Sequence, residues 1–510
     1  MINRRDFLKM IGVGAGSILA GSGVARALAS PELPEVLRAP SSAELRDPAV
    51  HILNRLAFGA RPGQAAAVRA MGIDKYIEQQ LAPELIDDSA SEARLGDLIT
   101  LDMMPAEMLA IGKQPREIAA ELVAATIMRA IYSERQLLEM MTNFWSEHFS
   151  IYHHKTTCTI LKTPDDRDVI RKNALGKFRD LLGASAKSPA MLIYLDNAES
   201  LKEHPNENYA RELMELHTIT IGNYTEDDVK QVARAFTGWT VRRGTGEFLF
   251  APQIHDDAPK TVLGQTLPGN GIQDGEAVLD ILAAHPNTAK HIASKLSRRF
   301  IADDPPESIV NAVADTYLKT GGDIKSMLRT IFGSQEFLNA PPKFKRPFEY
   351  LVSLFRALNV QQSGQITNII AGINAKQQAR PSAGLLLKAM GHLPFDWPSP
   401  DGYSDYAEIW IGDMLTRWNT AVLIGYGVIR GTTVDLVKTA GEQGADLTGR
   451  GVVDYFATHL LGRALTQAES DAIWGYANQF GEIELANKNG RRALSETVSL
   501  IAASPAFQYR

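Results

Sequence analysis

Residues 204–239, HPNENYARELMELHTITIGNYTEDDVKQVARAFTGW, hold the densest set of reactive side chains in this sequence and show the pattern that decides its fold. Apolar residues recur at helical spacing on both sides of a Gly-Asn turn at 222–223, which predicts two helices. Thr225 with Asp228 three residues later is typical of a capping box at the start of the second helix. The same helical periodicity begins at Ala49 and continues through most of the chain.

One stretch departs from this pattern. Phe248, Phe250 and Val262 stand in a turn-rich segment that predicts a small β-hairpin excursion near residues 246–267. Residues 30–45 are rich in Pro, Ser and Glu and predict a flexible leader, and no later linker is long enough to force a domain boundary. We therefore predict a mainly α fold, with a single large multi-helix domain over residues 46–510.

Residues 1–29 have the features of a twin-arginine signal peptide. Arg4-Arg5 precede Phe7-Leu8, a weakly hydrophobic Gly/Ala segment follows, and Ala27-Leu28-Ala29 is an A-x-A cleavage site. We expect export in the folded state by the twin-arginine (Tat) machinery, to the periplasm or the extracellular space.

Composition narrows the classes of partner and cofactor. The formal net charge is −6, so no overall basic field attracts nucleic acid. Beyond the signal peptide there is no apolar run of about 18 residues, so we expect no permanent membrane span. The single cysteine, Cys158, excludes a disulfide framework, a Cys-rich zinc site and a CxxCH attachment of c-type haem.

A polar stripe runs along the predicted helix at 204–219. On a wheel of 100° per residue, a sector about 100° wide contains Asn208, Arg211, Glu212 and Glu215. His217 falls on the far side of this wheel. One interpretation is a solvated salt-bridge ladder that starts at Glu207 and passes through Arg211. In the other interpretation the stripe is buried. Arg211 then keeps one carboxylate ionised, and a second carboxylate is free to act as a general base.

The predicted helix at 134–150 carries a second polar stripe. Within about 60° of Glu139 on the wheel lie Arg135, Thr142, Asn143 and Ser146. His148 falls in the middle of the apolar face instead. A histidine in that position is more often a core residue with one backbone partner than a metal ligand, and both interpretations remain open.

Histidines are concentrated in this part of the chain. Six of the eleven are His148, His153, His154, His204, His217 and His255. Imidazoles with nearby carboxylates suit Zn, Fe, Ni or Cu. A divalent transition metal is therefore a candidate cofactor, with His148 and Glu212 as candidate ligands, and the pattern is specific to no one metal. No HExxH motif is present. Because adjacent residues point different ways on a regular helix or strand, we expect at most one of His153 and His154 in a site.

Two loops carry further candidates. His255, Asp256 and Lys260 could supply an acid, a base and an anion-binding ammonium. Alternatively, Asp256 ties down a turn and Lys260 is a solvated charge. The Pro/aromatic loop at 392–403 either stacks on sugar rings or, as we favour, forms a stiff strap that packs its aromatic side chains inward.

Several motifs together resemble one bacterial family. They are HILNR at 51–55, FWSEHF at 144–149, NENYARELMEL at 206–216, GNYTEDDV at 222–229, ARAFTGW at 233–239, HD…K at 255–260 and KRPF at 345–348. In this order they resemble the family catalogued as domain of unknown function 1800, over about residues 46–505. The resemblance implies an exported, largely helical protein, of a group often encoded beside exported proteins with a sulfatase-like fold. It implies no particular reaction.

Two functions therefore compete. The first is an exported enzyme, hydrolytic or metal-dependent, with a polar site between the helices at 134–150 and 204–217 and the loop at 255–260. Its candidate residues are His148, Glu207, Arg211, Glu212, His255, Asp256 and Lys260. The acid–base or metal-binding roles would belong to His148, Glu207 and Glu212, and anion binding to Arg211 and Lys260. The alternative is a non-catalytic envelope scaffold or partner of another exported protein, in which the polar stripes are internal buttresses.

Overall fold

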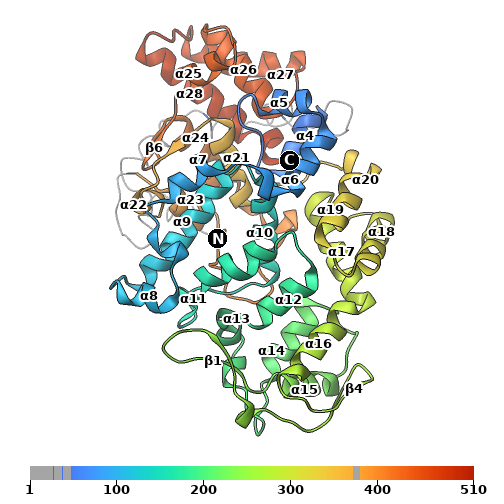
Figure 1. The fold of residues 1–510 in the computed structure, drawn as a ribbon. Coiled ribbons are helices and arrows are strands. Elements are labelled where there is room, and N and C mark those ends of the chain that lie inside the picture. The colour runs from blue at the N-terminus through green and yellow to red at the C-terminus, as the bar shows by residue number, and fades with distance from the viewer. Residues whose placement is uncertain (1–23, 25–26, 28–36, 38–46, 371–379) are drawn as a thin grey trace.

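The described part of the chain is mainly α-helical, and its strands form two-stranded antiparallel pairs (Figure 1). The computed structural model describes residues 24, 27, 37, 47–370 and 380–510. The predicted fold class is confirmed. The predicted signal peptide at 1–29 and leader at 30–45 lie outside the described residues except at Val24, Ala27 and Leu37.

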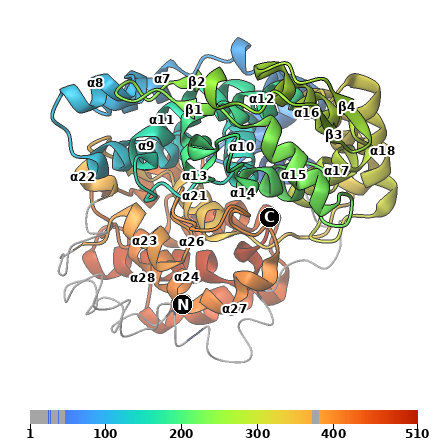
Figure 2. The ribbon, with the colours of Figure 1, turned by 90° about the horizontal axis from the view of Figure 1, so that it is seen from below.

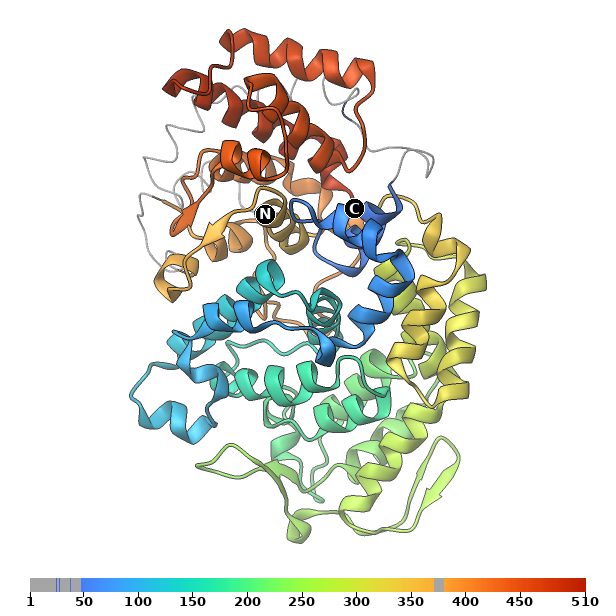
Figure 3. The same ribbon diagram turned by 45° about the horizontal axis from the view of Figure 1, so that its top comes forward.

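Two long helices form the centre of the N-terminal half (Figure 3). α9 (Pro115–Tyr132) starts with a proline, and the side chain of Glu117 accepts the N–H of Gln114, which satisfies one free donor of the first turn. Nearly every residue of α10 (Gln136–His148) is buried, so its polar stripe contacts protein rather than solvent. The helices that precede them in the chain are α4 (Pro48–Leu56), α5 (Gln64–Met71), α6 (Ile73–Leu81), α7 (Ser89–Glu92) and α8 (Pro105–Ala110).

Two of the next helices widen into π-helical turns. α11 (Cys158–Pro164) continues as η5 (Asp165–Arg171), and α14 (Glu207–Glu212) continues as η7 (Leu213–His217). A π-turn bonds five residues back instead of four, so successive side chains no longer advance by 100°. The regular wheel for 204–219 therefore does not apply beyond Glu212. His217 is buried away from the polar stripe, and its ring lies beside that of His148.

The helices that flank these turns are shorter. They are α12 (Phe178–Ala186), α13 (Pro189–Tyr194) and α15 (Glu226–Ala235). The capping box predicted for α15 is present, because Thr225 Oγ1 accepts the N–H of Asp228 and the Asp228 carboxylate accepts the N–H of Thr225.

The β-hairpin expected near 246–267 is two separate hairpins. They pair β1 (Trp239–Val241) with β2 (Phe248–Phe250), and β3 (Lys260–Val262) with β4 (Gln265–Leu267). The two expected strands therefore belong to different pairs. Gly244, with a φ of +92°, lies in the turn before β2, and Gly264, with a φ of +76°, lies between β3 and β4, so each strand pairs with its nearest neighbour in sequence. A third pair joins β5 (Gln361–Gln362) to β6 (Thr432–Thr433).

The C-terminal half adds two groups of helices. The first comprises α16 (Ile272–Ala284), α17 (Pro286–Phe300), α18 (Glu307–Thr320), α19 (Ile324–Phe332), α20 (Gln335–Leu338), α21 (Pro347–Ala357), α22 (Ile366–Ile369) and α23 (Ala383–Ala389). The second comprises α24 (Met414–Gly425), α25 (Leu436–Glu442), α26 (Gly449–Leu461), α27 (Gln467–Ala477) and α28 (Lys488–Ala503). The second group lies together on one side of the molecule (Figure 2).

A single hydrophobic core cluster joins these groups. It includes residues from Ala49 of α4 to Phe507 near the C-terminus, and α21 contacts both α9 and α24. In the described part of the chain we find no helix with the length and hydropathy of a membrane span.

Candidate functional sites

Residues 392–406 form a strap that crosses α10, α17 and α21. His392 accepts the N–H of Phe348 in α21, and its ring stacks on Trp410 with centroids 5.0 Å apart. Tyr403 and Trp410 are both buried. The aromatic side chains therefore pack inward, in agreement with the strap interpretation, and form no open platform for sugars.

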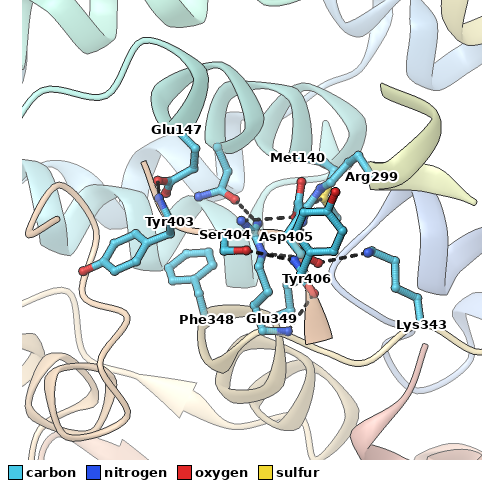
Figure 4. A network of polar contacts seen from close by, with 12 residues as sticks. Met140, Glu147, Arg299, Lys343, Phe348, Glu349, Tyr403, Ser404, Asp405 and Tyr406 are labelled. Carbon is cyan, nitrogen blue, oxygen red and sulfur yellow. Dashed lines mark hydrogen bonds and ion pairs between the residues drawn. The ribbon is translucent and has the colours of Figure 1, made fainter. Parts of the chain in front are cut away.

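A buried network of charges holds the C-terminal end of the strap (Figure 4). The carboxylate of Asp405 accepts a hydrogen bond from Arg299 (3.1 Å) and lies 3.4 Å from Arg346. Glu349 of α21 pairs with the same two arginines. Burial acts to raise the pKa of Glu349, but Arg299, Arg510 and Arg346 outweigh it and hold that pKa well below its usual range. The strap is thus fixed by ionised, mutually paired groups.

The polar stripe of α10 serves as a buttress. Glu139 forms a bidentate pair with Arg171 of η5 (2.6 and 3.0 Å), and Asn143 accepts a hydrogen bond from Arg346 (2.7 Å). A cavity of about 10 Å³ lies beside them, close to the volume needed for one water molecule. The hydroxyls of Thr142 and Ser146 line it and have no hydrogen-bond partner among the described residues. The stripe therefore joins α10 to its neighbours and leaves room for little more than one water.

His148, at the end of α10, lies in a cluster of basic side chains. Its Nε2 is 3.2 Å from the carbonyl oxygen of His217, and its Nδ1 is 3.0 Å from Nζ of Lys295. The rings of His217 and His291 each lie 5.9 Å from that of His148. We call these four residues the Lys295 cluster. Because the carbonyl can only accept, His148 donates from Nε2 and accepts at Nδ1, which is the neutral imidazole.

Burial determines the protonation of the Lys295 cluster. It lowers the pKa of His217 to about 3 and the pKa of His291 to about 4, and Lys295 adds to both shifts. Burial, followed by Lys295, holds the pKa of His148 well below its usual range. Burial also lowers the pKa of Lys295 to about 8. A lysine close to deprotonation therefore contacts a neutral imidazole.

The candidates on the 204–217 helix are divided between surface and interior. Arg211 forms a bidentate pair with Glu226 of α15 (2.8 and 2.7 Å) and lies 3.8 Å from Glu207. The salt-bridge interpretation therefore describes Glu207 and Arg211, although the main partner of Arg211 is on the next helix. Glu212 is half-buried, and burial, followed by the charge of Glu215, raises the pKa of its carboxyl group.

The 255–260 loop forms a second buried cluster. Nδ1 of His255 is 2.7 Å from the carbonyl oxygen of Thr237, and its Nε2 is 3.4 Å from Asp274. Lys260 donates a hydrogen bond to Asp274 (2.7 Å) and is fully buried. The interpretation of Lys260 as a solvated charge is therefore wrong, because Asp274 of α16 supplies a counter-ion inside the protein.

Asp256 in the same loop has the expected structural contacts. Its carboxylate accepts two hydrogen bonds from Arg234 (2.6 and 3.2 Å) and one from the N–H of Ala258 (2.9 Å). Burial acts to raise its pKa, but these bonds outweigh burial and lower it. Asp256 therefore ties down the turn as an ionised carboxylate.

One group in the described residues has the geometry of a metal site. His153, His154 and Asp396 each offer a ligand atom, and these atoms all lie within 4.8 Å of one another. Nε2 of His154 is 3.1 Å, and Nε2 of His153 is 3.7 Å, from Oδ1 of Asp396. The proposed ligands His148 and Glu212 do not belong to this group. The expectation that His153 and His154 point different ways is wrong, because both imidazoles face Asp396.

Irregular backbone explains how both histidines reach one carboxylate. Residues 151–157 form turns rather than a helix or strand, and Thr156 has a φ of +47°. The N–H of His153 donates to the carbonyl oxygen of Phe395 (3.1 Å), whose own φ is +63°. The alternation of side chains on a regular element therefore does not apply, and the two rings lie only 3.9 Å apart.

The charge state of this group suits metal binding. Burial, followed by the neighbouring His153, lowers the pKa of His154, which favours the neutral imidazole that binds metals. Burial acts to raise the pKa of Asp396, but His153, Lys388 and His154 outweigh it and lower that pKa. Asp396 is therefore ionised, the form in which a carboxylate can bind a cation.

The sequence interpretation missed Asp396, His291, Lys295 and Asp274. His291 and Lys295 stand four residues apart, so they lie on one face of α17, a signal that the sequence did carry. Asp396 lies in an irregular Pro/aromatic strap, where no periodicity indicates the direction of a side chain.

Comparison with known proteins places most of the chain in one family. The model of a family described as "Protein of unknown function (DUF1800)" matches residues 51–509. No curated protein and no solved structure matches the chain. The matched range contains every candidate site discussed above. The chain therefore belongs to the DUF1800 family.

Proposed function

We propose that this protein is an exported metal-dependent enzyme whose metal centre is formed by His153, His154 and Asp396. The observation that carries the proposal is the convergence of these three ligand atoms within 4.8 Å. The two imidazoles come from one locked turn after α10, and the carboxylate comes from the strap. Backbone hydrogen bonds hold two of the three residues, because the N–H of His153 donates to the carbonyl oxygen of Phe395 (3.1 Å) and that of Asp396 donates to the carbonyl oxygen of Leu393 (3.2 Å).

The donor set supports this proposal. Two imidazoles and one carboxylate suit Zn²⁺ and Fe²⁺. Three protein ligands leave coordination positions for water or substrate, as in catalytic rather than structural sites. A metal ion in such a site supplies Lewis acidity and lowers the pKa of bound water, the chemistry that hydrolysis needs.

Burial and access also support it. Nε2 of His153 is buried and has no hydrogen-bond partner among the described residues. A buried nitrogen without a partner is unfavourable by about 1–3 kcal/mol, which a bound cation would offset. The side chain of His154 is 50% exposed and that of Asp396 19%, so a substrate can approach from that side.

The predicted export route is compatible with a metalloenzyme. The twin-arginine pattern at Arg4-Arg5 directs export of folded proteins, so the metal can be acquired before transport. The alternative function, a scaffold or partner of another exported protein, requires no metal.

Metal content tests the proposal. We expect protein purified from its native export route to contain about one equivalent of zinc or iron, and Asp396→Asn to lose it. Asp401→Asn is the matched control, because Asp401 is an exposed carboxylate on the same strap. A metal-free wild-type protein that copurifies with another exported protein would instead favour the scaffold function.

A further inference from the structure

We propose that Lys295 is a reactive amine that forms imines with small aldehydes or ketones, with His148 as its acid–base group. The site lies between α10, η7 and α17, and it is separate from the His153, His154 and Asp396 group. It does not depend on the proposed metal centre.

Lys295 differs from other buried lysines in its partner. Lys162 pairs with Asp165 at 2.6 Å, and Lys260 pairs with Asp274 at 2.7 Å. Among the described residues, no carboxylate oxygen lies within 4.0 Å of Nζ of Lys295. Its nitrogen instead contacts Nδ1 of His148 at 3.0 Å. An ammonium without a counter-ion in a desolvated position is weakly stabilised, so the neutral amine forms readily.

The surroundings of Lys295 also favour its neutral amine. Burial has the largest effect on Lys295 and lowers its pKa to about 8, and Arg298 lowers it further. The negative charges of Asp405, Glu147 and Asp401 raise the pKa of Lys295, but none of these carboxylates is close enough to form an ion pair with it. Two of them are engaged elsewhere, since Asp405 pairs with Arg299 and Glu147 accepts the N–H of Tyr403.

Exposure distinguishes Lys295 from Lys345, a desolvated lysine that also has no carboxylate partner among the described residues. Lys345 is almost fully buried, and its Nζ lies 3.5 Å from the centroid of the Phe507 ring, so a substrate cannot reach it. Lys295 is only partly buried. It therefore combines a desolvated amine with a side chain that is partly exposed to solvent.

The reaction balances with groups that are present. The neutral Nζ attacks the carbonyl carbon, so an N–C bond forms and the π electrons of the C=O bond move to oxygen. Nδ1 of His148 accepts the proton from nitrogen and returns it to that oxygen, which gives a carbinolamine. Nδ1 of His148 then accepts the remaining proton of the carbinolamine nitrogen and delivers it to the hydroxyl. The C–O bond breaks, water leaves, and the electrons on nitrogen form the C=N bond of the imine. Overall, amine and carbonyl give imine and water, with no change in oxidation state.

Reductive trapping tests the proposal on the full mature protein. Propionaldehyde forms the imine, and sodium cyanoborohydride reduces it to a stable secondary amine that peptide mass spectrometry can quantify. At pH 7 a lysine of pKa about 8 has on the order of 100 times more neutral amine than one of pKa 10.4. We therefore expect Lys295 to be labelled at least about 30-fold faster than the exposed Lys230 and Lys319.

Two further measurements complete the test. The labelling rate of Lys295 should level off above about pH 8. The variant His148→Gln should be labelled more slowly at Lys295 than the wild type, provided that a cooperative thermal unfolding transition shows that the variant is folded. If that variant does not fold, the dependence of the Lys295 labelling rate on pH in the wild-type protein tests the proposal by itself. Labelling of Lys295 no faster than that of Lys319, or a rate that still rises steeply above pH 9, would overturn the proposal.

Discussion

The main-chain N–H of Tyr403 donates a hydrogen bond to Oε2 of Glu147 (2.9 Å), which fastens the strap to the end of α10 (Figure 4). Gly402 lies against the carbonyl oxygen of the same glutamate, where an added Cβ would be only 2.2 Å from that oxygen. This contact positions the strap that also carries Asp396 and Asp405. The strap therefore depends on a glycine at this position.

Replacing Gly402 with alanine should displace the strap. The φ of Gly402 is +72°, and the new methyl group would meet backbone that cannot move independently of α10. We expect destabilisation by more than about 2 kcal/mol, measured by urea denaturation. Gly391→Ala is the matched control, because its φ is +74° but no atom lies within 4 Å of the added Cβ. Equal effects of the two changes would contradict the proposed contact.

Replacing Glu349 with glutamine should be strongly destabilising. The change leaves Arg299, Arg346 and Arg510 buried with one counter-charge fewer. Loss of one partner of a buried ion pair typically lowers the free energy of unfolding by about 3–5 kcal/mol. Chemical denaturation measures the effect. Glu226→Gln, which removes the solvent-screened partner of Arg211, should change stability far less.

Stability should fall as the pH decreases from 6.5 towards 3. The pKa of His217 is lowered from 6.5 to about 3 in the folded protein, so below pH 6.5 the unfolded chain binds a proton that the folded protein does not. The stabilisation is complete above pH 6.5 and is lost progressively as the pH falls through this window. His217→Phe should reduce the slope of unfolding free energy against pH by about 1.4 kcal/mol per pH unit. Denaturation curves at several pH values that give unchanged slopes would refute this account.

Zinc should stabilise the wild-type protein after treatment with a chelator. A ligand that binds only the folded state at 100 times its dissociation constant adds about 2.7 kcal/mol to the free energy of unfolding. We expect thermal unfolding of the chelated protein to shift upward on addition of Zn²⁺, and the shift to disappear in Asp396→Asn. The Asp401→Asn control should respond like the wild type, since Asp401 is not part of the three-residue group.

Export should depend on the arginine pair at positions 4 and 5. Replacing both residues with lysine keeps the charge and removes the guanidinium groups that the twin-arginine pattern requires. We expect the precursor to remain inside the cell, as measured by immunoblots of cell fractions. Processing and export at the wild-type level would contradict the predicted route.

Local patterns in the sequence were sufficient to predict the helical fold. The spacing of apolar residues, and capping boxes such as Thr225 with Asp228, depend only on residues close together in the chain. The polar stripe on α10 was also recognised, but its role was not, because Arg171 and Arg346 reach it from distant elements. The wheel placed His217 away from the polar stripe but could not indicate its contact with His148, because that contact joins two separate elements and His217 lies in the π-turn at Leu213–His217.

The sequence by itself determined the helical class, the signal peptide pattern and the resemblance to the DUF1800 family, since each is encoded in contiguous residues. Only the tertiary structure decided which reactive side chains meet. Asp396 reaches His153 and His154 through an irregular strap, and Lys295 reaches His148 from another helix. The physical reason is that these contacts join segments far apart in the chain. Their geometry depends on how the helices pack and, at His153 and Asp396, on irregular backbone with positive φ at Thr156 and Phe395, rather than on any local period.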